Sequence, residues 1–144
     1  MLKAVIIDGS AVARGLLNTV LTDGGYDVVG QAHTCAAGSA LLIKFNPQII
    51  CIARDQVEQD IPGMTAMRKQ WPKALIFMMS SEFDANTIQT AHAMGINGFI
   101  VKPFNADTVL KTIRNTVITM VKRQQKAQAA QNGDEAPPAE PGEG

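Results

Sequence analysis

The sequence lacks any apolar run long enough to cross a membrane. No segment approaches the ~20 consecutive apolar residues of a transmembrane helix. The first residues, Met1-Leu2-Lys3, lead directly into an apolar run without the layout of a signal peptide. We therefore expect a cytoplasmic protein that makes no contact with a membrane.

Cysteine and clustered basic residues are also scarce. Cys35 and Cys51 lack CxxC spacing, so we expect both to be reduced. Of the 13 acidic residues four fall in residues 132–144, which leaves nine against 13 lysines and arginines before that segment. This small basic excess is not the dense stripe that nucleic acid requires, and we expect no nucleic-acid partner.

His33 and His92 lie far apart without companion ligands, so no metal site is expected there.

The length and composition indicate one folded domain. A chain of 144 residues that is 46% hydrophobic can bury one core. We assign residues 1–121 to this domain and residues 122–131, rich in Gln, Ala and Lys, to a helical extension of its last helix. Residues 132–144 are acidic and rich in proline and glycine, and we expect them to be disordered. The projecting helix leads to the hypothesis that the protein forms a homodimer through it.

Five β-rich runs alternate with five segments of helical periodicity. Strands are predicted at 4–7, 26–31, 48–53, 75–79 and 98–101, and helices at 11–22, 34–45, 64–70, 84–95 and from 105 onward, with Thr34, Asp84 and Asn105 as helix caps. Between 54 and 63 the polar sequence with Pro62-Gly63 predicts a loop. The alternation predicts an α/β fold in which helices cover both faces of a parallel sheet.

The residues that follow the strands matter most for function. Ligands of open parallel sheets bind beyond the carboxyl ends of the strands. These positions hold Asp8, Ala53, Ser80 and the dipeptide Lys102-Pro103. We therefore expect a carboxylate, a hydroxyl and an ammonium group to converge at one edge of the sheet.

From Leu2 to about Val121 the chain resembles the receiver domain of two-component response regulators, the CheY-like family. Asp8 matches the first of the family's two acids, Ser80 the hydroxyl, Phe99 the aromatic of the fifth strand and Lys102-Pro103-Phe104 the Lys-Pro motif, and the segments GGYDVVGQAHT and HAMGINGFIVKPFN also look like family sequence. The resemblance implies a flavodoxin-like (βα)5 three-layer sandwich with strand order 2-1-3-4-5. It also implies a phosphorelay signalling module that is not an enzyme.

Two family carboxylates are missing from the pattern. Gly9 stands where the second acid would supply a Mg²⁺ ligand. The family's phospho-accepting aspartate comes six residues after a proline, and six residues after Pro47 the chain has Ala53. Counting back eight residues from Gly63 gives Asp55 instead.

We prefer Ala53 as the acceptor position. An acceptor at Asp55 would place Arg54 at the last buried position of the central strand, where desolvation of its charge is costly. The expected molecule is therefore a degenerate pseudo-receiver without cofactor, in which Lys102 forms an ion pair with Asp8. The alternative is a single-domain response regulator that is phosphorylated on Asp55, with Mg²⁺ held by Asp8 and Asp55.

The resemblance also implies a protein partner, namely a sensor kinase or another signalling protein. The family's output surface is formed by the fourth helix, fifth strand and fifth helix, here residues 84–94, 99–102 and 105–121. A third hypothesis is a flavodoxin-like protein that binds a flavin, cobalamin or nucleotide. The chain lacks the DxHxxG and GxxxxGK[ST] motifs for the last two, and Gly9-Ser10 is only a weak trace of a flavin phosphate site.

Overall fold

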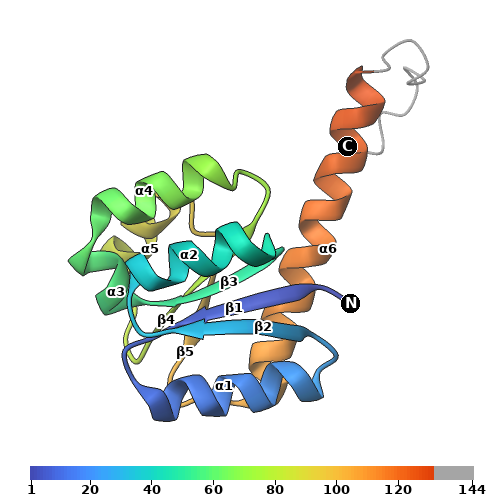
Figure 1. Ribbon diagram of the computed structural model, residues 1–144. Coiled ribbons are helices and arrows are strands. Elements are labelled where there is room, and N and C mark those ends of the chain that lie inside the picture. Colours follow the sequence, from blue (N-terminus) through green and yellow to red (C-terminus); the bar gives the residue numbers. More distant parts are fainter. Residues whose placement is uncertain (132–144) are drawn as a thin grey trace.

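The computed structural model describes residues 1–131, which form one five-stranded sheet between helices (Figure 1). The strands are β1 (Lys3–Ile7), β2 (Asp27–Ala32), β3 (Ile49–Ala53), β4 (Leu75–Ser80) and β5 (Gly98–Val101). Their spatial order is β2-β1-β3-β4-β5, and all four neighbouring pairs are parallel. The fold class and strand order predicted from the sequence are confirmed.

Helices cover both faces of the sheet. They are α1 (Ala11–Asp23), α2 (Cys35–Phe45), α3 (Arg54–Gln59), α4 (Ile61–Gln70), α5 (Ala85–Ala93) and α6 (Ala106–Gln131). Leu17 and Leu21 of α1 share one buried cluster with Val109 and Ile113 of α6, whereas α2, α3, α4 and α5 contribute to the cluster on the opposite face. In the described range, no helix is both long and apolar enough to cross a membrane.

Strand β3 lies at the centre of the sheet and is buried throughout. All five of its residues have an exposed fraction of 1% or less, as expected for a strand covered on both faces. Its Cys51 is unpaired, as is the buried Cys35. Burial raises the pKa of the Cys51 thiol to about 12, so this side chain stays protonated and serves as an apolar core residue.

The loop predicted for residues 54–63 is wrong. This segment contains helix α3 and the first turn of α4. Arg54 and Glu58 are four residues apart and form an ion pair along α3, while Val57 is fully buried beneath them. Asp60 then caps α4 by accepting a hydrogen bond from the Gly63 N–H (3.0 Å). Pro62 falls in the first turn of α4, where a missing N–H costs no intrahelical bond.

The three predicted caps are confirmed. Thr34 accepts a hydrogen bond from the Ala37 N–H (3.1 Å), Asp84 from the Thr87 N–H (2.7 Å) and Asn105 from the Thr108 N–H (3.0 Å). The hydrogen bonds from Thr87 hold the pKa of Asp84 below its usual value. Each cap fixes the start of a helix directly after a loop at the carboxyl edge of the sheet, and so it restrains the loops that carry the candidate site.

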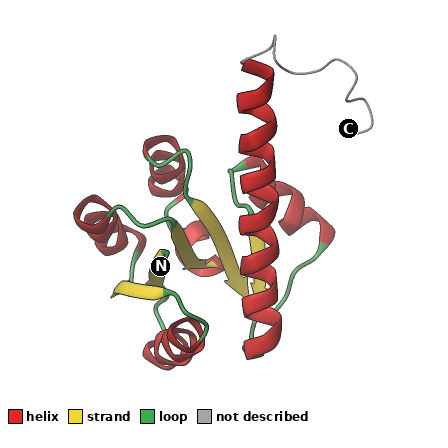
Figure 2. Ribbon diagram, turned by 90° about the vertical axis from the view of Figure 1, so that its right-hand side faces the viewer, coloured by secondary structure: helices red, strands yellow, loops and turns green. Residues whose placement is uncertain are grey.

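Helix α6 continues beyond the sheet at the amino edge, as Figure 2 shows. Residues 121–130 are all exposed and helical. The helix thus spans the predicted extension, residues 122–131. The disorder expected for residues 132–144 concerns a segment outside the described residues, and homodimer formation remains a hypothesis.

Arg68 ties together two connections at the amino edge. Its guanidinium donates hydrogen bonds to the carbonyl oxygens of Gly95 (3.1 Å), Trp71 (2.8 Å), Pro72 (3.2 Å) and Ala74 (2.7 Å), and to Oδ1 of Asn97 (3.0 Å). Burial lowers the pKa of this group. The bonds join the end of α4 to the turn before β4 and the turn before β5.

Replacing Arg68 by methionine should lower the free energy of unfolding by about 2–3 kcal/mol, because several partly buried carbonyl oxygens would lose their donor. Urea unfolding followed by circular dichroism measures this. Lys69→Met, at the neighbouring exposed position, is the matched control and should change stability by less than about 0.5 kcal/mol. Equal effects of the two substitutions would contradict the role assigned to Arg68.

Candidate functional site

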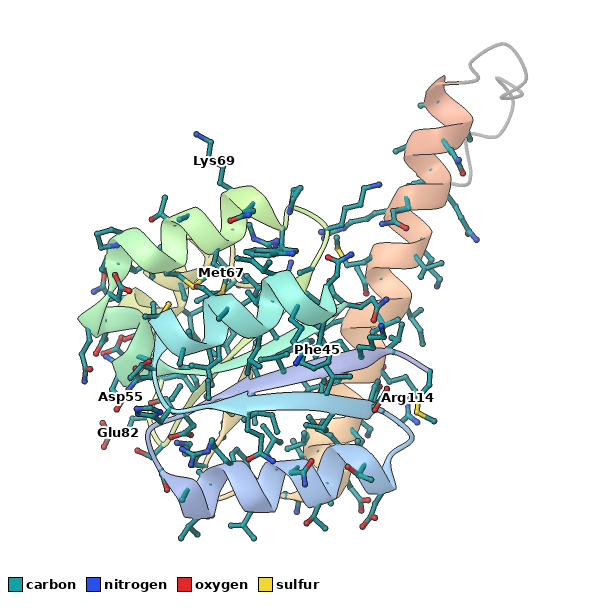
Figure 3. The ribbon with its side chains drawn as sticks, viewed as in Figure 1. Phe45, Asp55, Met67, Lys69, Glu82 and Arg114 are labelled. Atoms are coloured by element: carbon teal, nitrogen blue, oxygen red, sulfur yellow. The ribbon has the colours of Figure 1, made fainter. Side chains whose placement is uncertain are left out.

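A pocket of about 340 Å³ opens at the carboxyl edge of the sheet. It is lined by Asp8, Gly9, Ser10, Arg54, Asp55, Glu58, Met79, Ser80, Ser81 and Lys102. These residues lie at or just after the ends of β1, β3, β4 and β5, the strand ends at which the sequence predicted a site. Figure 3 labels Asp55 and Glu82 at this end of the sheet, opposite to the end where α6 extends.

The Asp8 carboxylate is the most buried charge in the pocket. Its Oδ2 accepts a hydrogen bond from the Lys102 Nζ at 2.6 Å, and its Oδ1 accepts one from the Ser10 N–H at 2.9 Å. The Asp8 side chain is 4% exposed and that of Lys102 27%. The predicted ion pair is therefore present and largely shielded from water, so that each charge is compensated by the other.

Ala53 and Gly9 bring no side-chain oxygen to this edge. Ala53 is the last residue of β3 and is 1% exposed, with Met79 of β4 as its neighbour in the sheet. Gly9 is exposed and lines the pocket directly after Asp8. A Cβ built on Gly9 would lie 3.5 Å from Nε2 of Gln56, an ordinary contact, so this position has room for a side chain.

Asp55, the alternative acceptor, lies in the first turn of α3 and is exposed. Its Oδ1 accepts a hydrogen bond from the N–H of the next residue, Gln56, at 3.0 Å. Asp55 lines the same pocket as Asp8 and Lys102, but among the described residues no hydrogen bond or ion pair joins it to either of them.

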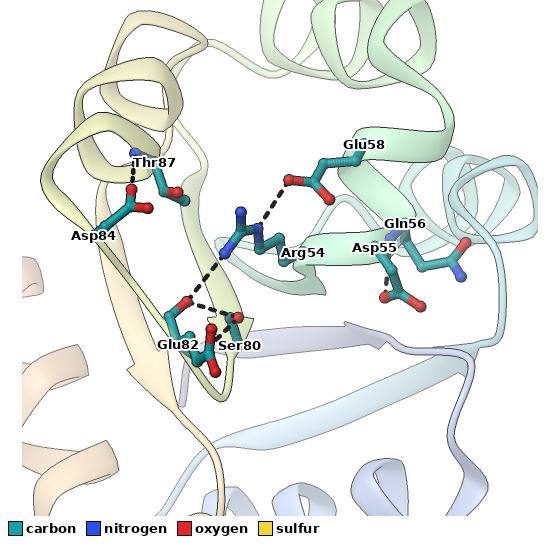
Figure 4. A network of polar contacts seen from close by, with 8 residues as sticks. All are labelled: Arg54, Asp55, Gln56, Glu58, Ser80, Glu82, Asp84 and Thr87. Carbon is teal, nitrogen blue, oxygen red and sulfur yellow. Dashed lines mark hydrogen bonds and ion pairs between the residues drawn. The ribbon is translucent and has the colours of Figure 1, made fainter.

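Arg54 links α3 to the loop between β4 and α5 (Figure 4). Its Nε contacts Glu58 at 2.8 Å, and its Nη1 donates to the Glu82 carbonyl oxygen at 3.1 Å. The hydrogen bond with Glu58 raises the pKa of Arg54, so the guanidinium stays charged. The Arg54 bond to Glu82 was not predicted from the sequence, although the four-residue spacing of Arg54 and Glu58 indicates a helix.

Ser80 is engaged within the same loop. Its hydroxyl donates to the Glu82 carbonyl oxygen at 2.9 Å and accepts from the Glu82 N–H at 3.2 Å. These bonds are those expected of a hydroxyl that caps the loop before Asp84. The loop is therefore held from two sides, by Ser80 from β4 and by Arg54 from α3.

Phe99 and Pro103 occupy the remaining family positions. The Phe99 ring is partly buried, and it meets Phe83 and His92 edge to face at centroid distances of 5.1 and 5.2 Å. It therefore packs between the loop before α5 and α5 itself. Pro103 is exposed and follows Lys102 through a cis peptide bond.

The donor set of the pocket fits a magnesium ion poorly. Mg²⁺ prefers an octahedral shell of oxygen ligands, usually with carboxylates among them. Within residues 1–131, no group of three or more His, Cys, Asp or Glu side chains is placed to hold a metal ion. Asp8, the buried carboxylate of this pocket, already contacts Lys102.

Comparison with known proteins establishes the family. The response regulator receiver domain model matches residues 4–114, most of the chain. The chemotaxis protein CheY of Bacillus subtilis is 30% identical over 118 residues, which cover 80% of this chain and 97% of that protein. The structure of the chemotaxis response regulator CheY4 of Vibrio cholerae superposes with a TM-score of 0.72 at 28% identity, covering 81% of this chain and 98% of that one.

The chain therefore belongs to the response regulator receiver family of two-component signalling and is of the CheY type. Receiver domains are signalling modules that interact with kinases and other signalling proteins, and they are generally not enzymes. An enzyme does occur among the relatives: a protein-glutamate methylesterase/protein-glutamine glutaminase of Halobacterium salinarum is 27% identical. That alignment covers 98% of this chain but 42% of the longer enzyme.

Replacing Lys102 by methionine should lower the free energy of unfolding at neutral pH by about 2–3 kcal/mol, because the buried Asp8 carboxylate would lose its counter-charge. Adding Asp8→Asn should recover most of this loss, since the amide carries no charge and can still accept the Ser10 N–H. Urea unfolding of both variants tests the pair. A double variant no more stable than Lys102→Met alone would show that the Asp8 charge does not depend on Lys102.

Replacing Arg54 by glutamine should loosen the loop between β4 and α5, because the Glu82 carbonyl oxygen loses its charged donor. Hydrogen exchange of the amides of residues 81–83 should become several times faster. Glu58→Gln is the matched control, since it removes the ion pair and leaves the Arg54 bond to Glu82 in place. Unchanged exchange in Arg54→Gln would mean that Ser80 alone holds the loop.

Proposed function

We propose that this protein is a pseudo-receiver, a signalling module that acts by protein binding without being phosphorylated. The observation that carries the proposal is the end of β3, where Ala53 presents a methyl group. Phosphoryl transfer to a receiver requires a carboxylate oxygen that attacks phosphorus in line with the leaving group. A methyl group has no lone pair to offer, so this position accepts no phosphoryl group.

The surroundings of Ala53 support the same proposal. A divalent cation normally neutralises the charge that develops on the transferred group. Gly9 provides no carboxylate for such an ion, and the Asp8 carboxylate is already compensated by Lys102 at 2.6 Å. The pocket therefore favours a self-contained ion pair over a magnesium and phosphoryl site, and we expect the protein to need no cofactor.

Asp55 is the acceptor of the competing proposal. Its position in the pocket lining keeps it near the right edge of the sheet. To act as an acceptor it would have to approach Lys102, with which it makes no ion pair among the described residues. The first turn of α3 and the hydrogen bond to the Gln56 N–H favour the outward position of Asp55 instead.

We infer that the partner is a signalling protein of the cytoplasm, a sensor kinase or one of its other targets. The proposed contact face consists of α5, β5 and α6 up to Val121. Val101 at the end of β5 is 55% exposed and offers this face an apolar contact. Phe99 packs β5 against α5 through His92, and α6 also contacts β5.

Incubation with acetyl phosphate and Mg²⁺ followed by intact mass measurement tests the proposal. The protein should keep its mass, because neither Ala53 nor the paired Asp8 can be phosphorylated. Gain of one phosphoryl group by the native chain, and loss of that gain in Asp55→Asn, would overturn the proposal in favour of Asp55.

The double substitution Gly9→Asp and Ala53→Asp is the positive control for this experiment. It places a carboxylate at each of the two family positions that lack one, while Lys102 and Ser80 stay in place. We expect this variant to gain the mass of one phosphoryl group in the presence of Mg²⁺, and to lose that gain when the metal is chelated.

A further inference from the structure

A groove of about 320 Å³ lies at the amino edge of the sheet, at the opposite end from the Asp8 pocket. It is formed by the residues that precede β3 and β4. Pro47, Trp71 and Pro72 supply its apolar surface, and Lys73 stands at its rim. Pro47 is buried and Trp71 is half-buried, so the indole ring is a fixed and accessible part of the wall.

The charge around the groove is positive. None of its lining residues is acidic. Lys69 and Lys73 are exposed, and Figure 3 shows the Lys69 side chain pointing away from α4 into solvent. Beneath the groove, the Arg68 guanidinium bonds to the carbonyl oxygens of Trp71 and Pro72. Its five hydrogen-bond partners are all uncharged, so among residues 1–131 no carboxylate offsets this charge.

We propose that this groove binds the C-terminal segment of the same chain, residues 132–144. That segment, NGDEAPPAEPGEG, has four acidic residues and no basic one. Its charge is thus complementary to Arg68, Lys69 and Lys73. The groove is a binding site for an acidic, proline-containing peptide, and its ligand is supplied in cis.

The prolines of the segment match the apolar wall. Pro138 and Pro141 have the PxxP spacing. In peptides that bind as a polyproline II helix, which has three residues per turn, this spacing places both rings on one side. Such segments bind grooves lined by aromatic residues. Among residues 1–131, no hydrogen bond engages the Trp71 indole N–H, which is therefore available to donate to a peptide carbonyl oxygen.

The segment is tethered close enough to reach the groove. Arg123 of α6 and Asn97 line a common pocket, Asn97 contacts Arg68, and Arg68 contacts Trp71. From Arg123 the helix continues for eight residues to Gln131, about 12 Å at 1.5 Å per residue. The thirteen residues that follow span up to about 43 Å when extended. This length is enough for the segment to return about 12 Å along α6 and to cross the side chains that lie between α6 and the groove.

Fluorescence quenching tests the proposal, because Trp71 is the only tryptophan of the chain. Acrylamide should quench the intact protein about twofold less than a full-length variant with Pro137, Pro138 and Pro141 changed to glycine, as expected when a tethered ligand is bound most of the time. A second full-length variant, with the four acids changed to glutamine, should lose the same protection. Equal quenching of all three proteins would overturn the proposal.

Salt and a charge reversal provide a second readout. Raising the ionic strength should increase quenching of the intact protein, because salt screens attraction between exposed charges. Lys73→Glu should increase it as well, whereas Lys111→Glu, an exposed base on α6 outside the groove, should not. Identical effects of the two substitutions would contradict binding at this groove.

The concentration dependence separates binding in cis from binding between two copies. Protection of Trp71 should be independent of protein concentration, since the segment is part of the same chain. A synthetic peptide of residues 132–144 should protect Trp71 in the proline variant only at high concentration, about millimolar, because it lacks the tether. Protection of the intact protein that disappears on dilution would contradict the proposal and assign the ligand to a second copy.

Discussion

The ion pair between Asp8 and Lys102 is the interaction on which the carboxyl edge of this protein depends. A carboxylate that is 4% exposed is costly to bury without compensation, and the Lys102 Nζ at 2.6 Å provides it. The pair joins the end of β1 to the end of β5, the first and last strands along the chain, across the mouth of one pocket. In a family whose members use this edge to receive a charged group, the chain instead contains a charge pair that is already complete.

A second ion pair, between Arg54 and Glu58, lies in the same pocket. Arg54 pairs with Glu58 and also holds the loop after β4, whose hydroxyl residue, Ser80, is bonded to its own loop. The pocket thus contains two ion pairs, Asp8 with Lys102 and Arg54 with Glu58. Hydrogen bonds fix the loop after β4. An added phosphoryl group would need an acceptor carboxylate at the end of β3 and a freed Lys102, whereas Ala53 has no side-chain oxygen and Lys102 is paired with Asp8. In the proposed function, the signalling state would therefore be set by the bound partner.

The sequence predicted the sheet and most helix boundaries because the signals there were local. The apolar runs of the strands and the caps Thr34, Asp84 and Asn105 are signals that act within a few residues. The Asp8 and Lys102 pair was also predictable, since parallel strands bring their carboxyl ends to one edge. Residues 54–63 were misjudged because Pro62-Gly63 is typical of turns, while the stabilising contacts, the buried Val57 and the Asp60 cap, depend on tertiary packing. The contact of Arg54 with Glu82 spans 28 residues and carried no local signal.

The proposed function depends on the absence of an oxygen nucleophile at the end of β3, where Ala53 stands. Amide NMR spectra recorded during addition of Mg²⁺ and beryllofluoride, a mimic of the phosphoryl group that bonds to a carboxylate oxygen, test it directly. We expect that the resonances of Gly9, Ala53, Ser80 and Lys102 do not move. Saturable shifts of these four resonances, with Asp55 among the affected residues, would contradict it.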